Sequence, residues 1–459
     1  MHPLLPRTLL VVPLVLGLHA VALSQDAADH DLEHTQRVLT ELIHRKLDRG
    51  VASISIALVR GEEIVWTAAL GHANVRMQVA ATPETLYVTG STFKAVTATA
   101  LLQLAERGRV DLDDPINDHL GEHSVEDLEG KPVTLRHLLS HTSGLSTGAN
   151  TEEVWSRRLP MSLAELPRVV RAVRAPGESY EYNNYGYGIA GYLVERVSGQ
   201  DFEDYVVKHV LAPLGIETPG PVRPTPEMVE RLALPYVPSP EGPRPVAQTF
   251  FDVYPAGDIY LTAEDMARFL GAHLSGGAFQ GRRILSAEST AEAHRPQFFD
   301  YALGWGTDPD ARHLISHGGG VNGFRAHMLG DLEAKVGAYV MSNSGEVDDL
   351  ARVAVALLRG EDVWVPPKRV AVSVEAEILE AYVGRYELRP ELVFTITREE
   401  ARLFLQATGG QRRELPAASP TEFFLTSADA DLRFLHNEEG VVDRLLFVQG
   451  AEYTAKRVE

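Results

Sequence analysis

The sequence predicts an α+β protein in which an antiparallel sheet flanked by helices carries an inserted helical subdomain, followed by a small all-β barrel. Strand-like segments lie near residues 53–68 and again near 314–341, and a mostly helical stretch separates them. This order is typical of one antiparallel sheet closed by both ends of a domain. Beyond about residue 375, turn-forming residues separate short alternating apolar runs, which indicates a barrel or sandwich. A chain of 459 residues also exceeds what one hydrophobic core usually serves.

The first 24 residues have the pattern of a secretory signal peptide. Arg7 precedes an apolar run at residues 8–18, and residues 22–24 place small side chains at alternate positions, as signal peptidase requires. We therefore expect a signal peptide at 1–24 and a periplasmic or secreted mature protein without stable membrane insertion. The alternative, an uncleaved membrane anchor, is disfavoured because Pro13 interrupts a run that is already short.

The next elements are a helix and a hairpin. Apolar residues recur at helical spacing from Leu32 to Leu47 and Gly50 follows them, which predicts an amphipathic helix against a core. Residues 53–59 and 64–68 then flank a polar turn, as in a β-hairpin.

A proline pair marks the best candidate for a linker between two domains. Pro366 and Pro367 lie among polar residues, where the texture of the sequence changes. We therefore expect a first domain at 25–362, a linker at 363–374 and a β domain at 375–459.

Charge and cysteine content exclude several classes of function. The formal net charge of −20 repels phosphate backbones and anionic lipid, so we expect no nucleic-acid partner. The chain has no cysteine, which excludes disulfides, thiol catalysis and cysteine-based metal sites.

Ser91 and Lys94 form the first candidate catalytic pair. Gly90 precedes Ser91, and an Ala- and Leu-rich stretch to Arg107 predicts a helix, so Ser91 lies where backbone N–H groups favour developing negative charge. Lys94, one helical turn later, reaches the Ser91 hydroxyl. The other basic residues are mostly arginine, which stays protonated, whereas a desolvated lysine acts as a base. The alternative is an ordinary surface lysine.

Tyr182 and Asn184 form the second candidate group, on a loop opened by Pro176-Gly177. A nearby ammonium favours the phenolate of a tyrosine, whose ordinary pKa is about 10, and so makes Tyr182 a usable base. Asn184 can donate to a substrate carbonyl and accept from Lys94. Loops rich in Tyr and Asn are also common structural features, so this alternative stays open.

The third candidate group is a histidine followed by three glycines, His317-Gly318-Gly319-Gly320. Consecutive glycines in a strand indicate that a substrate or a helix end approaches the backbone closely. An N–H here, that of Gly320, would pair with the Ser91 N–H as an oxyanion hole. The alternative is a glycine bulge at a sheet edge.

These three groups, in this order, resemble the three-box signature of the penicillin-recognising serine hydrolases, which have the β-lactamase/transpeptidase-like fold. The resemblance is greatest to the branch of class C β-lactamases and D-alanyl-D-alanine carboxypeptidases, which also contains D-aminopeptidases and esterases. It runs from about residue 31 to residue 358 and includes residues 135–145, 255–257 and 301–306. The C-terminal β domain resembles the lipocalin-like appendages of some members.

The resemblance implies a role for each matching residue. Ser91 would be the nucleophile, Lys94 its proton partner, Tyr182 the general base and acid, Asn184 a positioning amide and His317 the head of the third box, with Gly318 and Gly319 beside the substrate. The amides of Ser91 and Gly320 would form the oxyanion hole. The family implies a small peptide, amide or ester substrate, and an acyl-enzyme hydrolysed by water without a metal or other cofactor.

The third box departs from the family pattern. Many relatives have Lys-Thr-Gly there and hold a substrate carboxylate with it, whereas this chain has a histidine that is neutral above a pKa of about 6.5, and no hydroxyl. We therefore expect weak carboxylate recognition, and an esterase or an aminopeptidase rather than an efficient β-lactamase. Arg325 would restore a carboxylate contact if it faced the substrate. Asp258 replaces a small residue of many relatives, and nothing in the sequence explains it.

Other functions are possible from the sequence. A true β-lactamase and a catalytically inactive penicillin-binding or scaffold protein share the same boxes. His137 and His141 are spaced as zinc ligands on a helix are, but no acidic residue lies between them. No Gly-x-Ser-x-Gly motif of an α/β-hydrolase is present. The sequence has no feature that defines the oligomeric state.

Overall fold

The computed structural model describes residues 16–125, 128, 130–146, 155–156, 162–216, 226–239, 241–251, 253–298, 300–363, 371–425, 430–449 and 451–458. Most of the expected signal segment, residues 1–15, and most of the expected linker, residues 364–370, lie outside them. Among the described residues, no helix has the length and apolar character needed to cross a bilayer. The chain divides into two compact units, Met1–Val363 and Trp364–Glu459.

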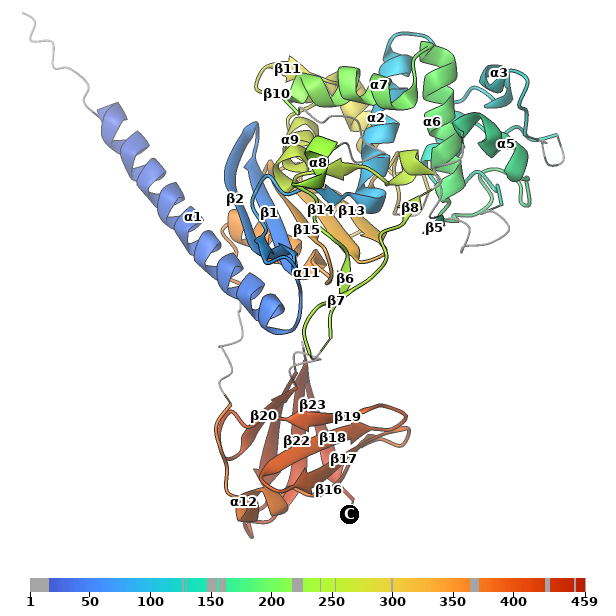
Figure 1. The fold of residues 1–459 in the computed structure, drawn as a ribbon. Helices are drawn as coiled ribbons and strands as arrows, with labels where there is room; N and C mark the ends of the chain where they lie inside the picture. The colour runs from blue at the N-terminus through green and yellow to red at the C-terminus, as the bar shows by residue number, and fades with distance from the viewer. Residues whose placement is uncertain are drawn as a thin grey trace, which may run out of the picture. The chain divides into compact units, whose positions relative to one another are not determined.

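A seven-stranded antiparallel sheet forms the centre of the larger unit (Figure 1). Its order is β12 (Gly306–Thr307), β13 (Leu314–Val321), β14 (Phe324–Asp331), β15 (Val336–Ser342), β1 (Ser53–Arg60), β2 (Glu63–Asn74) and β3 (Val79–Ala80). The central strands β1 and β15 come from opposite ends of the unit and pair in register, with Ile56 opposite Val340. This confirms the expected sheet closed by both ends of the domain.

Helices cover both faces of the sheet because the side chains of its central strands alternate. Ile54, Ile56 and Leu58 join one core with residues of α1 (Leu16–Asp48) and α11 (Asp348–Leu358). Ala57 and Val59 join the other core, which includes residues of α2 (Lys94–Glu106) and α9 (Ala263–Leu274). Helix α1 begins at Leu16, earlier than the apolar spacing from Leu32 predicted.

The inserted helical subdomain surrounds α2. Its other elements are η1 (Gly90–Phe93), α3 (Asn117–Leu120), α4 (Leu135–Leu139), η2 (Leu163–Glu165), α5 (Leu166–Val169), α6 (Asn184–Ser198), α7 (Phe202–Val206), η3 (Val207–Leu211), η4 (Ala212–Leu214), α8 (Pro226–Val229), η5 (Tyr254–Ala256) and α10 (Ala287–His294). Short strand pairs connect them: β4 (Tyr87–Val88) with β9 (Tyr260–Leu261), β5 (Trp155–Ser156) with β8 (Phe250–Phe251), β6 (Tyr236–Val237) with β7 (Arg244–Pro245), and β10 (Ala278–Phe279) with β11 (Arg282–Arg283).

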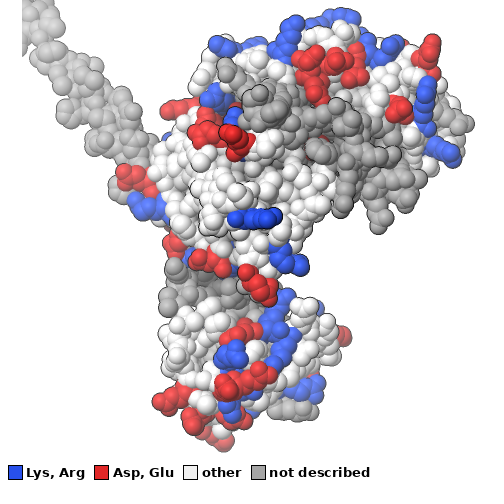
Figure 2. All heavy atoms as spheres, in the orientation of Figure 1, with Lys and Arg blue, Asp and Glu red and all other residues white. Residues whose placement is uncertain are grey.

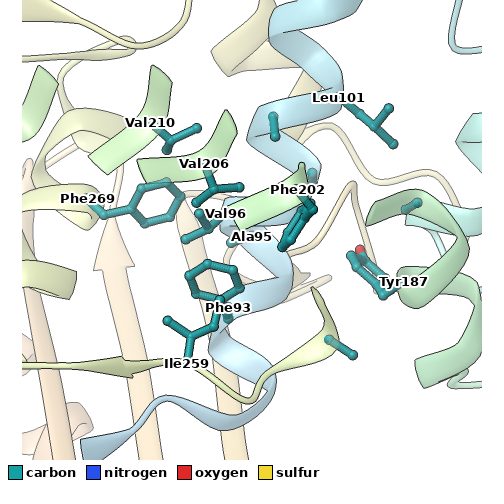
Figure 3. Close-up of a cluster of buried hydrophobic side chains, with 14 of the residues drawn as sticks. Phe93, Ala95, Val96, Leu101, Tyr187, Phe202, Val206, Val210, Ile259 and Phe269 are labelled. Carbon is teal, nitrogen blue, oxygen red and sulfur yellow. The ribbon is translucent and has the colours of Figure 1, made fainter. Parts of the chain in front are cut away.

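Helix α2 is buried on every side from Lys94 to Leu104. A helix that is apolar all round belongs inside a core. In Figure 3 Val96 lies beside Val206 of α7, whereas Leu101 points to the other side of the helix. The first turn of α2 is therefore held by dense packing, which suits a site that needs fixed geometry.

The smaller unit is an eight-stranded, nearly closed β-barrel. Its strands are β16 (Gly384–Arg389), β17 (Leu392–Glu399), β18 (Arg402–Ala407), β19 (Arg412–Leu415), β20 (Glu422–Leu425), β21 (Ala430–His436), β22 (Val442–Gln449) and β23 (Ala451–Arg457), with α12 (Ala376–Glu380) before them. They run β19-β18-β17-β16-β23-β22-β21-β20. The Phe424 N–H donates to the Pro416 carbonyl at 3.0 Å, next to the two edge strands. Side chains including Tyr386, Phe423 and Phe434 are buried together in the core of this barrel, as the small diameter of eight strands requires.

Candidate active site

Ser91 lies in η1, a short 3₁₀ turn that continues directly into α2. The side chain of Ser91 is partly exposed, whereas its neighbours Thr92 and Phe93 are fully buried. The buried neighbours hold the turn in the core, and the Ser91 hydroxyl is left at its surface. Backbone N–H groups at the start of a helical segment attract negative charge. The local geometry therefore has the features that a serine nucleophile needs.

Lys94 is completely buried, and its side-chain nitrogen lies within hydrogen-bond distance of three oxygen atoms. Nζ lies 3.0 Å from the Ser91 Oγ, 2.7 Å from the Asn184 Oδ1 and 2.9 Å from the Ala256 carbonyl oxygen. None of these acceptors carries a charge. Burial without a carboxylate partner holds the pKa of Lys94 well below its ordinary value, because it penalises the charged form. Lys94 therefore has the neutral amine of a base at a pH where ordinary lysines are protonated.

Tyr182 hydrogen-bonds to Ser91 through its hydroxyl. Burial of the hydroxyl end is the main reason why the pKa of Tyr182 is raised above its ordinary value, and the bond to Ser91 opposes this shift. The side chain as a whole is still 38% exposed. From the sequence we expect a neighbouring ammonium to lower this pKa, but the direction is the opposite. The reason is that burial of the Tyr182 hydroxyl penalises the charged phenolate.

Asn184 is the first residue of α6, which fixes its position. Asn183 caps this helix by accepting the Gly186 N–H on its side-chain oxygen, at 3.2 Å. The Asn183 amide nitrogen donates to the Leu145 carbonyl at 2.8 Å. Asn183 thus ties the start of α6 to the segment after α4. The sequence analysis missed Asn183, although Asn before an apolar run is a typical helix N-cap.

Three glycines allow the backbone around Ser91 to approach other segments closely. A methyl group on Gly319 of β13 would lie 2.4 Å from the Thr89 carbonyl oxygen and 3.3 Å from the Ser91 nitrogen. A methyl on Gly257 would lie 2.9 Å from the same nitrogen, and one on Gly90 would lie 2.8 Å from the Gly320 nitrogen. Real side chains do not tolerate such distances. The glycines therefore permit the start of the η1–α2 segment to approach the glycine-rich strand β13 closely.

The edge of β13 beside Ser91 has no strand partner among the described residues. Strand β12 pairs with β13 only through Ile315 and Ser316. The following residues, His317 to Gly320, pair on their other side with β14, where Gly320 lies opposite Arg325. The backbone at Gly318 and Gly320 is exposed. This unpaired edge lies close to the Ser91 amide.

His317 is buried, and both of its ring nitrogens are engaged. Nδ1 lies 2.7 Å from the Gly318 carbonyl and therefore donates to it, which leaves Nε2 to accept from the Tyr301 hydroxyl at 2.8 Å. Burial is the main cause that lowers the pKa of His317 to about 3. His317 is thus a neutral ring that is hydrogen-bonded to Tyr301. The sequence did not indicate that Tyr301 contacts His317.

Arg325 does not supply a free cation beside this neutral histidine. Its Nε pairs with Glu346 at 2.6 Å, and Nη1 donates to the carbonyls of Phe324 at 2.8 Å and Val321 at 3.2 Å. Asp258 is fully buried behind Gly257.

The two histidines that have zinc-ligand spacing do not share a helix face. Helix α4 ends at Leu139, and His141 has a left-handed backbone beyond it, with φ 59°. Nδ1 of His137 lies 3.1 Å from the Thr134 N–H, and Nδ1 of His141 accepts the Asn183 N–H at 3.0 Å. Among the described residues, no group of three or more His, Asp or Glu side chains has the geometry to hold a metal ion.

The fold and the arrangement of Ser91, Lys94 and Tyr182 are those of a penicillin-recognising serine hydrolase. The chain belongs to the Beta-lactamase family, which matches residues 35–360, and residues 368–457 match a family described as a domain of unknown function, DUF3471. The chain is 24% identical to penicillin-binding protein 4* of Bacillus subtilis over 435 residues, which cover 88% of this chain and 95% of that protein.

Solved structures with the same fold include a penicillin-binding protein homologue, an amidase and a hydrolase. A penicillin-binding protein homologue from Pyrococcus abyssi, described as octameric, superimposes with a TM-score of 0.63 at 24% identity, covering 92% of this chain and 99% of that one. The D-amino acid amidase of Ochrobactrum anthropi SV3 gives 0.61 at 24% identity, with 71% and 99% coverage. EstCE1, described as a hydrolase with promiscuous acyltransferase activity, gives 0.62 at 18% identity, with 72% and 100% coverage.

Proposed function

We propose that this protein hydrolyses amide or ester bonds outside the cytoplasm, through an acyl-enzyme on Ser91. One observation carries the proposal: the fully buried Nζ of Lys94, which has no charged partner in the described part of the chain, lies 3.0 Å from the Ser91 Oγ. A serine hydroxyl is a weak nucleophile until an adjacent base removes its proton. A neutral lysine within hydrogen-bond distance is such a base. The signal-like residues 1–24 support export.

The pKa directions divide the work between Lys94 and Tyr182 differently from the family expectation. The amine of Lys94 accepts the hydroxyl proton of Ser91 while Oγ bonds to the substrate carbonyl carbon. Tyr182, protonated because its pKa is raised, donates its proton to the leaving nitrogen or oxygen as that bond breaks. The Lys94 ammonium then returns its proton to the Tyr182 phenolate. In the second half the acyl carbon is attacked by water, whose proton is relayed through Tyr182 and Lys94 to the Ser91 Oγ, and the carboxylic acid and the free serine are released.

The amides of Ser91 and Gly320 stabilise the oxyanion that forms on the substrate carbonyl. Preorganised N–H donors of this kind contribute about 3–4 kcal/mol to transition-state stabilisation in acyl transfer. The support for this role is the close approach of β13 to η1 that the glycines permit. Asn184 holds Lys94 in place and faces the same site.

The substrate has a neutral group beside His317, at the position where relatives with Lys-Thr-Gly bind a substrate carboxylate. His317 is neutral with its nitrogens engaged, and Arg325 is paired with Glu346. A substrate carboxylate would lose its hydration there without gaining a charged partner, which is unfavourable. We therefore propose small esters and amino-acid amides as substrates. The amidase and esterase names of structural relatives support this choice.

A comparison of substrates on purified protein tests the proposal. We expect Ser91 to be labelled by a fluorophosphonate, and p-nitrophenyl acetate or an amino-acid p-nitroanilide to be hydrolysed with at least about tenfold higher kcat/KM than nitrocefin. The Ser91→Ala variant should lose both labelling and turnover. Faster turnover of nitrocefin would identify a β-lactamase, and a wild type without labelling or turnover would identify a binding or scaffold protein. Either result overturns the proposal.

A further inference from the structure

We infer that His141 is a positioning residue for Tyr182, holding the backbone on both sides of it. The inference rests on the proposed function, because it assigns His141 a part in the same site. It concerns a histidine that the mechanism above does not use. His141 belongs to the segment after α4 and is 1% exposed.

His141 contacts the two neighbours of Tyr182 with two different acceptors. Its carbonyl oxygen accepts the Glu181 N–H at 2.8 Å, and its ring Nδ1 accepts the Asn183 N–H at 3.0 Å. The ring itself lies against the Tyr182 ring, with centroids 4.3 Å apart. One residue thus holds the N–H of the residue before Tyr182 and that of the residue after it, and covers one face of the phenol.

The left-handed backbone of His141 indicates that its side chain contributes to the structure of the site. The Thr142 N–H donates to the His137 carbonyl at 2.9 Å and the His141 N–H to the Leu138 carbonyl at 3.4 Å, which is the Schellman arrangement at the end of α4. Its left-handed position, here φ 59°, is usually occupied by glycine, because other residues are strained there. A histidine at this position therefore gains something that glycine would not supply.

The hydrogen bonds of the ring support the same reading. Because Nδ1 accepts a hydrogen bond, Nε2 carries the ring hydrogen, and Nε2 has no hydrogen-bond partner among the described residues. Rings of Tyr180, Tyr187 and Tyr301 surround it, with centroids 4.8–5.8 Å away. Burial holds the pKa of His141 well below its ordinary value, so the ring stays neutral and keeps its acceptor.

Substitution of His141 by asparagine or by glycine distinguishes the role of the Nδ1 acceptor from the role of the left-handed backbone. Both residues tolerate a left-handed backbone, but only asparagine has a side-chain oxygen that replaces Nδ1 as an acceptor. We expect H141G to lower kcat about 10- to 100-fold, since a shift of about 1 Å in a reacting group costs this much. H141N should retain kcat within about threefold. H273N, which changes another fully buried histidine of the core, is the matched control and should leave kcat near wild type.

A double-mutant cycle shows whether His141 acts through Tyr182. If it does, adding H141G to Tyr182→Phe should reduce kcat by less than about threefold, because there is no longer a phenolic proton to position. Equal losses in both backgrounds, or an H141N variant as impaired as H141G, would overturn the inference. If H141G fails to fold, H141N alone decides. Full activity in Ser91→Ala would instead refute the proposed function, so the two failures are distinguishable.

Discussion

The Nζ of Lys94 lies 2.7 Å from the Oδ1 of Asn184, a residue ninety positions further along the chain. This bond joins the first turn of the buried helix α2 to the first residue of α6. The remaining two acceptors of the lysine, the Ser91 hydroxyl and the Ala256 carbonyl, come from η1 and η5. Three segments thus replace the water around one amine with uncharged acceptors. This loss of water lowers the pKa of Lys94, and the proposed role of Lys94 as a base depends on it.

Lys94→Met tests the buried neutral amine through the pH dependence of stability. The pKa of Lys94 is lowered on folding, so between the folded value and the unfolded value of about 10.4 the unfolded chain binds more protons. Wild-type stability therefore rises with pH in this window, by up to about 1.4 kcal/mol per pH unit. Denaturant unfolding at pH 7, 8 and 9 should show this slope in wild type relative to the variant. Parallel curves would mean that Lys94 is charged in the folded protein.

Tyr182→Phe should affect catalysis far more than stability. The variant loses the proton donor to the leaving group, and such a loss typically lowers the rate about 10²–10⁴-fold. The ring is 38% exposed and its packing is retained, so the melting temperature should change little. Steady-state kinetics and calorimetry on the same sample measure both. An unchanged kcat would remove Tyr182 from the mechanism.

Gly319→Ala should damage the site, whereas Gly318→Ala should not. The first methyl would lie 2.4 Å from the Thr89 carbonyl oxygen and would push β13 away from η1. The second has His327 Nδ1 at 3.8 Å as its nearest contact. We expect about a 10²-fold loss of kcat/KM for Gly319→Ala, because the oxyanion donors move apart. The neighbouring variant should stay within about 0.5 kcal/mol of wild-type stability and near wild-type activity. Equal effects of the two substitutions would contradict this account.

The barrel should fold without the rest of the chain. We predict that residues 364–459 unfold cooperatively on their own in a circular-dichroism melt. Phe434 stacks on Tyr382, with centroids 4.2 Å apart, inside the barrel core. Phe434→Ala should cost about 3–5 kcal/mol, which is a large part of the stability of a small domain. Phe404→Ala is the control, because this ring is only partly buried and lies under Arg412, and its loss should cost about 0.5–1 kcal/mol. A fragment without a cooperative transition would contradict the prediction.

Much of the fold was predictable because strand alternation and helical spacing are local patterns. The alternation in residues 53–59 assigned a strand, and its pairing partner from the far end of the unit followed from the order of the elements. The helical spacing of apolar residues placed the start of the first helix too late, near Leu32 rather than Leu16. Apolar spacing marks only the part of a helix that packs on a core, and it does not show where the helix begins.

The candidate site was predictable as a set of residues but not as a state of charge. Residue type and spacing singled out Ser91, Lys94, Tyr182 and His317 as candidates, and the resemblance to the family implied a role for each. The direction of the Tyr182 pKa shift was predicted wrongly. A pKa depends on desolvation and on every neighbouring dipole, and those neighbours come from segments far apart in the sequence.

The sequence by itself determined the family, the two-part organisation of the fold and the residue types available for acyl transfer. Only the tertiary structure decided that burial lowers the pKa of Lys94 and raises that of Tyr182, that His317 and Arg325 are already engaged, and that His141 holds the backbone around Tyr182. The physical reason is the same in each case. Motifs record which groups are present, whereas burial and the acceptors contributed by distant segments decide which groups carry a proton and which are free to act.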